Sequence, residues 1–315
     1  LSMTQSPDGT IWLGLDQGIE KLKPGRLITI YKEPEVDLGA VYTAALFKRV
    51  LYVGTNKGVF HYQQDTLTQK FHYQGFIDKS QGQVWELREY EGQLYCGHTR
   101  GTFIIRDNRL IPVSTASGGY CMKEFRCGTR ECLIQGTYSP LVIYDKLNDT
   151  WVYRNQVFGF QEPARFIQPD HLGNLWAAHV VQGLYKLRLS DHADTVKSIE
   201  SFGLKDGLPT EYNLKLFSLH NRLVITTGQE LFTWDDLSQK IIPYAALNEG
   251  VGEFRDATHI TDAGKERFWF IRKNEVRLFS IKDHMVQTEA SLFLPAYALS
   301  LMDKYENLIQ IDENQ

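Results

Sequence analysis

Guanidinium, imidazole and aromatic side chains recur in segments that we expect to be loops. Flat rings stack on sugar faces, and a guanidinium can hold a carboxylate or sulfate through two parallel hydrogen bonds. Seven such residues are our candidate ligand-binding set: Arg100, Tyr120, Tyr138, Phe158, His179, Tyr212 and Arg272. Phe160 and Phe254 are further aromatic residues of the same kind. The alternative is that these rings fill a channel or pack against neighbouring loops.

The sequence lacks the short motifs of common hydrolases and metal sites. No histidine pair has the helical spacing of a zinc hydrolase, and no Gly-x-Ser-x-Gly motif occurs. Glu33, Glu35 and Asp37 cluster in one apparent turn, and Asp235 and Asp236 in another. We interpret them as solvated loop charges, because no EF-hand-like loop accompanies them. We therefore predict no catalytic residue, no metal and no cofactor.

The segment 6–12 approaches the Asp box of sialidases, Ser-x-Asp-x-Gly-x-x-Trp, but is one residue too short. A glycan-cleaving enzyme is therefore one alternative for the chain. An Asp-Gly turn before an aromatic strand also arises from hairpin chemistry alone, which is the interpretation that we favour. Neither the arginine set and tyrosine of a sialidase nor the carboxylate pair of other glycosidases can be located from linear spacing.

A repeat must position these loops. Each copy has a turn, an apolar strand, a glycine-containing turn and a second apolar strand. The central large residues of the copies are Trp12, Tyr52, Tyr95, Ile134, Trp176, Val224 and Trp269. Their steps of 40, 43, 39, 42, 48 and 45 residues are close to the roughly 40–45 residues of a four-stranded propeller blade. The apolar segments are short, β-branched and aromatic, which excludes helical repeats.

One copy shows how a blade would form. Strands are predicted at 83–88, 94–96, 101–105 and 110–113, joined by turn residues. Gly97 follows the second strand and has no side chain, so we expect a neighbouring sheet to approach it closely. A single blade would expose both apolar faces, so the blades must assemble together.

We predict an all-β fold, a seven-bladed β-propeller of four-stranded antiparallel blades, as a single domain over 1–315. The expected blades are 1–34, 35–78, 79–118, 119–160, 161–209, 210–252 and 253–295. The tail, 296–315, would either close the ring or begin a further unit.

Composition and charge limit the classes of binding partner that we expect. The net charge is −4 and no basic block occurs, which argues against nucleic acid. No apolar run reaches the roughly 18 residues typical of a membrane span. The chain starts at Leu1 inside an apparent strand, so we expect an excised or processed fragment.

Four cysteines occur, at positions 96, 121, 127 and 132. The spacings among Cys121, Cys127 and Cys132 do not match the usual paired zinc ligands. A disulfide within this predicted hairpin is one alternative. Partly buried thiols are the other, and the one that we favour.

The best copies resemble the two-component-regulator propeller repeat, which builds the sensor regions of hybrid two-component histidine kinases in gut bacteria. The matching residues are Asp8, Gly9, Ile11, Trp12, Gly14, Gly18 and Ile19, then Gly173, Leu175, Trp176, Gly183, Leu184 and Tyr185. The linker 202–209 is similar to the Asp-Gly-Leu-Pro stretch that precedes a blade in those sensors. The resemblance covers essentially the whole chain, although the fourth, sixth and seventh copies depart from the consensus.

The resemblance implies a periplasmic sensor region, usually two propellers and a β-sandwich before a membrane helix and a cytoplasmic kinase. Members typically respond to glycan breakdown products. We therefore predict a non-catalytic ligand-recognition propeller, with an oligosaccharide ligand and a sister propeller or second protomer as partners. The consensus residues are structural, so the family supplies no ligand-binding residue. A glycan-cleaving propeller enzyme and a protein-interaction scaffold remain the alternatives, and the ligand, the binding face and the oligomeric state stay open.

Overall fold

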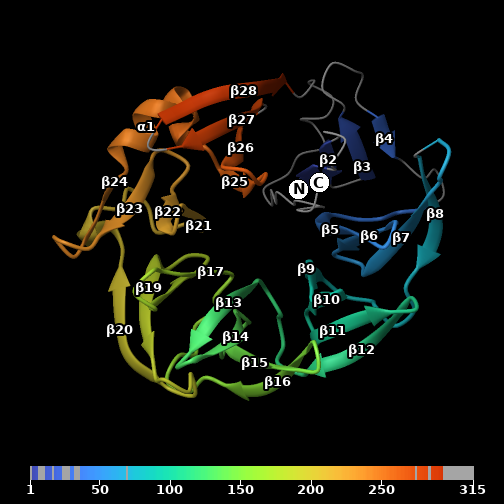
Figure 1. Ribbon diagram of the computed structural model, residues 1–315, viewed down its shortest axis with the longest axis horizontal. Coiled ribbons are helices and arrows are strands. Elements are labelled where there is room, and N and C mark those ends of the chain that lie inside the picture. Colours follow the sequence, from blue (N-terminus) through green and yellow to red (C-terminus); the bar gives the residue numbers. More distant parts are fainter. Residues whose placement is uncertain are drawn as a thin grey trace.

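The computed structural model describes residues 2–5, 11–15, 18–22, 29–31, 36–68, 70–273, 275–282 and 285–293. In this part of the chain, consecutive strands pair in order into antiparallel four-stranded sheets. The sheets follow one another around a centre, with the first strand of each innermost and the fourth outermost (Figure 1). This is the arrangement of propeller blades, so the all-β fold of four-stranded antiparallel blades is confirmed.

Six sheets are described through most of their connections. The first three comprise β5 (Val41–Phe47), β6 (Val50–Thr55), β7 (Val59–Gln64) and β8 (Phe71–Phe76); β9 (Val84–Tyr90), β10 (Gln93–His98), β11 (Gly101–Arg106) and β12 (Arg109–Ser114); and β13 (Met122–Cys127), β14 (Arg130–Gln135), β15 (Val142–Leu147) and β16 (Thr150–Gln156). The other three comprise β17 (Phe166–Pro169), β18 (Leu175–Ala178), β19 (Leu184–Leu189) and β20 (Val196–Phe202); β21 (Lys215–Leu219), β22 (Arg222–Thr226), β23 (Leu231–Asp235) and β24 (Lys240–Pro243); and β25 (His259–Asp262), β26 (Arg267–Arg272), β27 (Glu275–Lys282) and β28 (Met285–Phe293).

The predicted blade count needs a correction. The N-terminal sheet consists of β1 (Ser2–Gln5), β2 (Ile11–Leu15), β3 (Gly18–Leu22) and β4 (Thr29–Tyr31). Its strands have three to five residues, and the turns between them lie outside the described residues. The structure thus describes six full blades, β5 to β28, rather than seven equivalent ones, plus this shorter four-stranded sheet between β25–β28 and β5–β8 (Figure 1).

The first copy was predicted to be a full blade because the repeat consensus consists mainly of turn residues. The first copy matched best at its turn residues and at Trp12, but turn residues do not set strand length. Shorter strands form fewer ladder hydrogen bonds with their neighbours. The tail, 296–315, which we expected to close the ring or begin another unit, lies outside the described residues.

Apolar side chains fill the spaces between successive sheets. Six such clusters occur in the described part of the chain, each drawing residues from two neighbouring sheets. All seven central residues of the repeat are buried, from fully in Trp176 to 7% exposed in Tyr52. Burial of one large apolar side chain contributes about 1.5–3 kcal/mol. The contacts between sheets are therefore the main source of stability.

Glycines allow these sheets to approach one another. A Cβ atom built on Gly97 would lie 2.2 Å from the carbonyl oxygen of Gly119, in the link to the next blade. On Gly136 it would lie 2.0 Å from the carbonyl oxygen of Ala164. The close approach predicted at Gly97 is confirmed.

A disulfide joins Cys127 to Cys132 in the β13–β14 hairpin, while Cys96 and Cys121 are free thiols. The thiol alternative that we favoured is thus wrong for Cys127 and Cys132.

Helical turns occur only in links between blades within the described residues: η1 (Leu204–Asp206), α1 (Ala245–Val251) and η2 (Gly252–Asp256). No helix among the described residues is long and apolar enough to cross a membrane.

Candidate functional site

Six of the seven candidate ligand-binding residues share one face of the protein, whereas Phe158 pairs with Thr195 beside the β19–β20 turn. Antiparallel strands alternate in direction, so the connections between second and third strands emerge at the same face as the links between blades. We call it the link face. Arg100, Tyr138, His179 and Arg272 lie at connections between second and third strands, and Tyr120, Phe158 and Tyr212 lie in links between blades.

The structure brings two of the seven together around Trp85. The ring centroids of Tyr120 and Tyr138 are 5.3 Å apart and lie 5.2 and 6.4 Å from that of Trp85. Tyr42 stacks on Trp85 at 5.0 Å with an interplanar angle of 15°. The Arg165 guanidinium lies 5.6 Å from the Trp85 ring centroid. We call these five residues the Trp85 cluster.

Two β-bulges present Tyr42 and Trp85. In β5, Val41 pairs with Thr55 and Thr43 pairs with Gly54, so the strand register skips Tyr42. In β9, the register passes from Val84 to Glu86 and skips Trp85 in the same way. A bulge re-aims a side chain and commonly occurs next to a functional site. Equivalent positions in two adjacent innermost strands thus carry stacked aromatic rings.

The sequence did contain a signal for this pair. Tyr42 and Trp85 are 43 residues apart, one repeat length, so both are aromatic at the same point of successive copies. Trp85 lies within the strand predicted at 83–88, which kept it out of the candidate set of loop residues. Arg165 was missed as well, because nothing in its local sequence distinguishes it from other link residues.

Hydrogen bonds and burial determine which groups the cluster can offer to a ligand. The indole N–H of Trp85 donates to the Tyr138 hydroxyl oxygen at 3.1 Å. Tyr42 is buried, whereas the other four members are partly exposed. Burial raises the pKa of Tyr120 to about 12, so its hydroxyl stays protonated at neutral pH. The cluster therefore offers ring faces, neutral hydroxyl groups and one cation.

Further ionisable groups adjoin the cluster. The Glu86 carboxylate accepts a hydrogen bond from the Met122 N–H at 2.8 Å, and burial raises the pKa of Glu86. Burial also lowers the pKa of Lys123, with the positive charge of Arg88 contributing in the same direction. Arg88 and Lys123 thus lie within electrostatic range of each other and of the Glu86 carboxyl group.

Cys121 joins the innermost strands of two blades. Its Sγ atom donates to the Arg165 carbonyl oxygen and accepts from the Ile167 N–H, both at 3.3 Å. Burial raises its pKa to about 11, so it is a neutral thiol and a poor nucleophile at pH 7. Its role here is to hold Arg165 beside Trp85.

Of the other candidates, His179 lines a small pocket together with Arg165, while Arg272 and Arg100 are engaged elsewhere. Arg272 is engaged by Asp256 at 2.6 Å and Glu253 at 3.2 Å. His179 is buried, and its Nδ1 atom accepts the Val181 N–H at 3.1 Å.

Arg100 donates to the carbonyl oxygen of Lys79. Phe158 and Tyr212 are 67% and 66% exposed and show no ring contact with the Trp85 cluster. Phe160 and Phe254 are buried in the clusters between blades. Among the described residues, no group of three or more His, Cys, Asp or Glu side chains could hold a metal ion.

No protein-family model and no curated protein sequence matches the chain. Its fold is nevertheless similar to that of solved propellers. The extracellular domain of the putative hybrid two-component system BT4673 from B. thetaiotaomicron is 13% identical, with a TM-score of 0.54. The match covers 92% of this chain and 48% of that domain, so the chain spans about half the length of the sensor domain.

Propeller enzymes are similar to the same degree. Virginiamycin B lyase from Staphylococcus aureus is 12% identical over 86% of this chain and 90% of its own, with a TM-score of 0.54. A putative 6-phosphogluconolactonase from Bacteroides fragilis is 9% identical over 93% of this chain and 94% of its own, also with a TM-score of 0.54. At these identities the likeness shows a shared propeller fold, which sensor domains and enzymes both use.

Proposed function

We propose that the protein is a non-catalytic ligand-recognition propeller in the periplasmic sensor region of a hybrid two-component signalling protein. Its ligand is an oligosaccharide released by glycan breakdown, bound at the Trp85 cluster. The cluster is the observation that carries this proposal. Two matching bulges place stacked rings at one face, with hydroxyl groups and a guanidinium beside them.

The chemistry of the cluster suits such a ligand. Ring faces can cover the apolar face of a pyranose, while the Tyr120 and Tyr138 hydroxyls can hydrogen-bond to its edge. Arg165 can hold a carboxylate or sulfate through paired N–H groups. We therefore expect acidic oligosaccharides to bind more tightly than neutral ones.

Two observations support a sensor outside the cytoplasm. The Cys127–Cys132 disulfide is typical of an oxidising compartment. The likeness to an extracellular sensor domain covers nearly the whole chain. A ligand shifts a signalling equilibrium only by its differential affinity for two arrangements of the receptor. The propeller would act as a rigid part of that switch, against a sister propeller or a second protomer.

Isothermal titration calorimetry with acidic and neutral oligosaccharides tests the proposal. Replacing Trp85 by alanine removes the central ring, and we expect at least a tenfold loss of affinity, about 1.4 kcal/mol. Tyr138→Phe keeps the ring and loses only the hydroxyl, so a smaller loss is expected. Tyr212→Ala, on the same face and 66% exposed, is the matched control and should bind like the wild type.

Two results would count against the proposal. Unchanged affinity in a folded Trp85→Ala variant would show that the Trp85 cluster is not the binding site. Release of shortened products from any oligosaccharide in the panel would instead support the enzyme alternative, which the similarity to a propeller lyase and a lactonase keeps open.

A further inference from the structure

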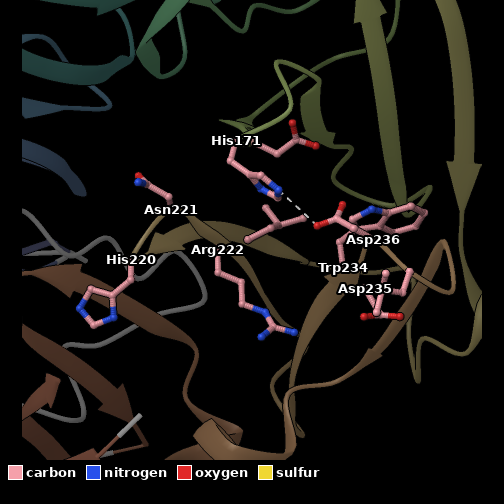
Figure 2. A pocket seen from close by; sticks show the side chains of 10 residues that line it. His171, His220, Asn221, Arg222, Trp234, Asp235 and Asp236 are labelled. Atoms are coloured by element: carbon pink, nitrogen blue, oxygen red, sulfur yellow. Dashed lines mark ion pairs between the residues drawn. The ribbon is translucent and has the colours of Figure 1, made fainter. Parts of the chain in front are cut away.

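A second concave site lies on the opposite face, where the turns between first and second strands and between third and fourth strands emerge. We call this the turn face. The cavity has a volume of about 500 Å³ and is formed by the β17–β18, β21–β22 and β23–β24 turns. Its volume lies within the roughly 300–1,000 Å³ typical of small-molecule sites. Figure 2 shows its side chains.

The floor of this turn-face pocket is rigid and apolar. Trp234 is only 6% exposed, and its ring packs on Trp176 at 5.1 Å between centroids. The Lys186 ammonium lies 4.0 Å from the Trp234 ring centroid. Leu223 is buried beside it, whereas Leu237 is 97% exposed at the rim. A fixed ring edge with leucine side chains offers contact to the C–H groups of a ligand.

Two of the three carboxylates in the pocket accept hydrogen bonds from residues close to them in the sequence. Asp170 accepts hydrogen bonds from the backbone N–H of Leu172, the backbone and side chain of Asn174, and the Trp176 indole. Asp235 accepts from the backbone and hydroxyl of Ser238. These two groups shape the pocket, and the third carboxylate, Asp236, is the one that can exchange partners.

The remaining polar groups can reach a ligand. Asp236 pairs with His171 at 3.3 Å, and both side chains are partly exposed. Arg222 donates through Nε to Thr233 at 3.1 Å and stacks on Tyr244, which holds its guanidinium in place.

Asn221 presents an exposed amide at the tip of the β21–β22 turn. Positive φ angles of 49° at His220 and 62° at Asn221 set that tip. The turn-face pocket thus combines fixed donors, one exchangeable carboxylate, an amide and an apolar floor.

The charged groups around the pocket indicate which class of ligand it can bind. Three carboxylates are set against the Arg222 guanidinium and the Lys186 ammonium behind the Trp234 ring, a formal charge of −1, so the site disfavours anions, unlike the Trp85 cluster, and has little excess charge to attract a cation. Paired donors and acceptors around an apolar floor match a ligand that carries many hydroxyl groups and no charge. We propose that the turn-face pocket is a binding site for a neutral polyhydroxylated ligand of one or two sugar-sized rings. It is independent of the Trp85 cluster.

The test uses the 315-residue chain and ¹H–¹⁵N NMR titration with maltose, cellobiose and myo-inositol as neutral probes. Galacturonate and glucosamine serve as the anionic and cationic comparators. We expect at least one neutral probe to shift the backbone signals of His220 and Asn221 and the indole signal of Trp234. Asn221→Ala removes one hydrogen-bonding pair and should raise the Kd about fivefold, as expected for the loss of one neutral hydrogen bond.

Asn148→Ala is the matched control. Asn148 is also exposed, with a φ of 49°, in a two-residue turn on the same face of another blade. It should leave the Kd unchanged. Three results would overturn the proposal. The first is the absence of signal shifts with every neutral probe at about 50 mM, a concentration that would detect even weak binding. The second is tighter binding of either charged comparator, and the third is equal Kd values for Asn221→Ala and Asn148→Ala.

Discussion

Gly97→Ala should destabilise the protein by forcing two blades apart. The added Cβ atom would lie 2.2 Å from the Gly119 carbonyl oxygen, where an ordinary contact is at least 3.4 Å. The link therefore has to move by about 1.2 Å. It cannot move freely, because Gly118 and Gly119 donate backbone hydrogen bonds to Thr99 and His98, both at 3.0 Å.

The magnitude follows from two opposing terms. Overpacking costs about 1–3 kcal/mol, and contact with hydrogen-bonded backbone places this site near the upper end. Alanine in place of a strand glycine restores about 0.5–1 kcal/mol, since Gly97 does not have a positive φ. A net loss of about 2 kcal/mol is expected, which lowers Tm by about 3 °C in a chain of 315 residues.

Differential scanning calorimetry and urea unfolding measure the change. Gly92→Ala is the comparison, because Gly92 has a φ of 70° with no atom within 4 Å of a built Cβ. It reports turn strain alone, about 1 kcal/mol. A Gly97→Ala variant as stable as the wild type would refute the argument that close blade contact requires glycine here. Because Tyr120 follows Gly119, the same variant should also bind oligosaccharides more weakly.

Three further changes probe individual contacts. The raised pKa of Glu86 means that the folded state binds protons more tightly than the unfolded state, so stability falls as pH rises from the ordinary carboxyl value to the raised one. Glu86→Gln should flatten this fall in Tm between pH 4 and 8; an unchanged slope would contradict it. Replacing Cys127 and Cys132 together by serine removes a short loop closure and should cost about 2 kcal/mol. Detection of four free thiols in the unfolded, unreduced wild type would show that the bond is absent. Tyr95→Phe leaves the Trp151 N–H, now bonded to the Tyr95 hydroxyl at 2.8 Å, unsatisfied between two blades. A loss of about 1–3 kcal/mol should appear in urea unfolding, and no loss would mean that water replaces the hydroxyl.

Several features of the fold could be predicted from local sequence. Short apolar segments separated by turn residues indicated four-stranded antiparallel blades, because strand alternation and turn chemistry are local properties. The close approach of a neighbouring blade at Gly97 could be predicted for the same reason. A glycine at a repeated position beside a strand usually marks a place where another backbone approaches closely. The large residue at the centre of each copy is buried in every case.

The sites depended on information that no local pattern contains. Arg272 and Tyr138 occupy comparable loop positions, yet one is held by two carboxylates and the other adjoins Trp85. The turn-face pocket was not predicted, because His171 and Asp236 come from turns of different blades that meet only after the blades pack.

Sequence alone determined the all-β blade architecture and the glycine that permits close blade contact, since both follow from properties of neighbouring residues. Tertiary structure decided which sheets are full blades, that Cys127 and Cys132 are joined, and which rings meet at Trp85. The bulges that bring the Tyr42 and Trp85 rings together arise from hydrogen-bond register between strands. Register depends on how each sheet packs against its neighbour, so it is settled only when the blades assemble.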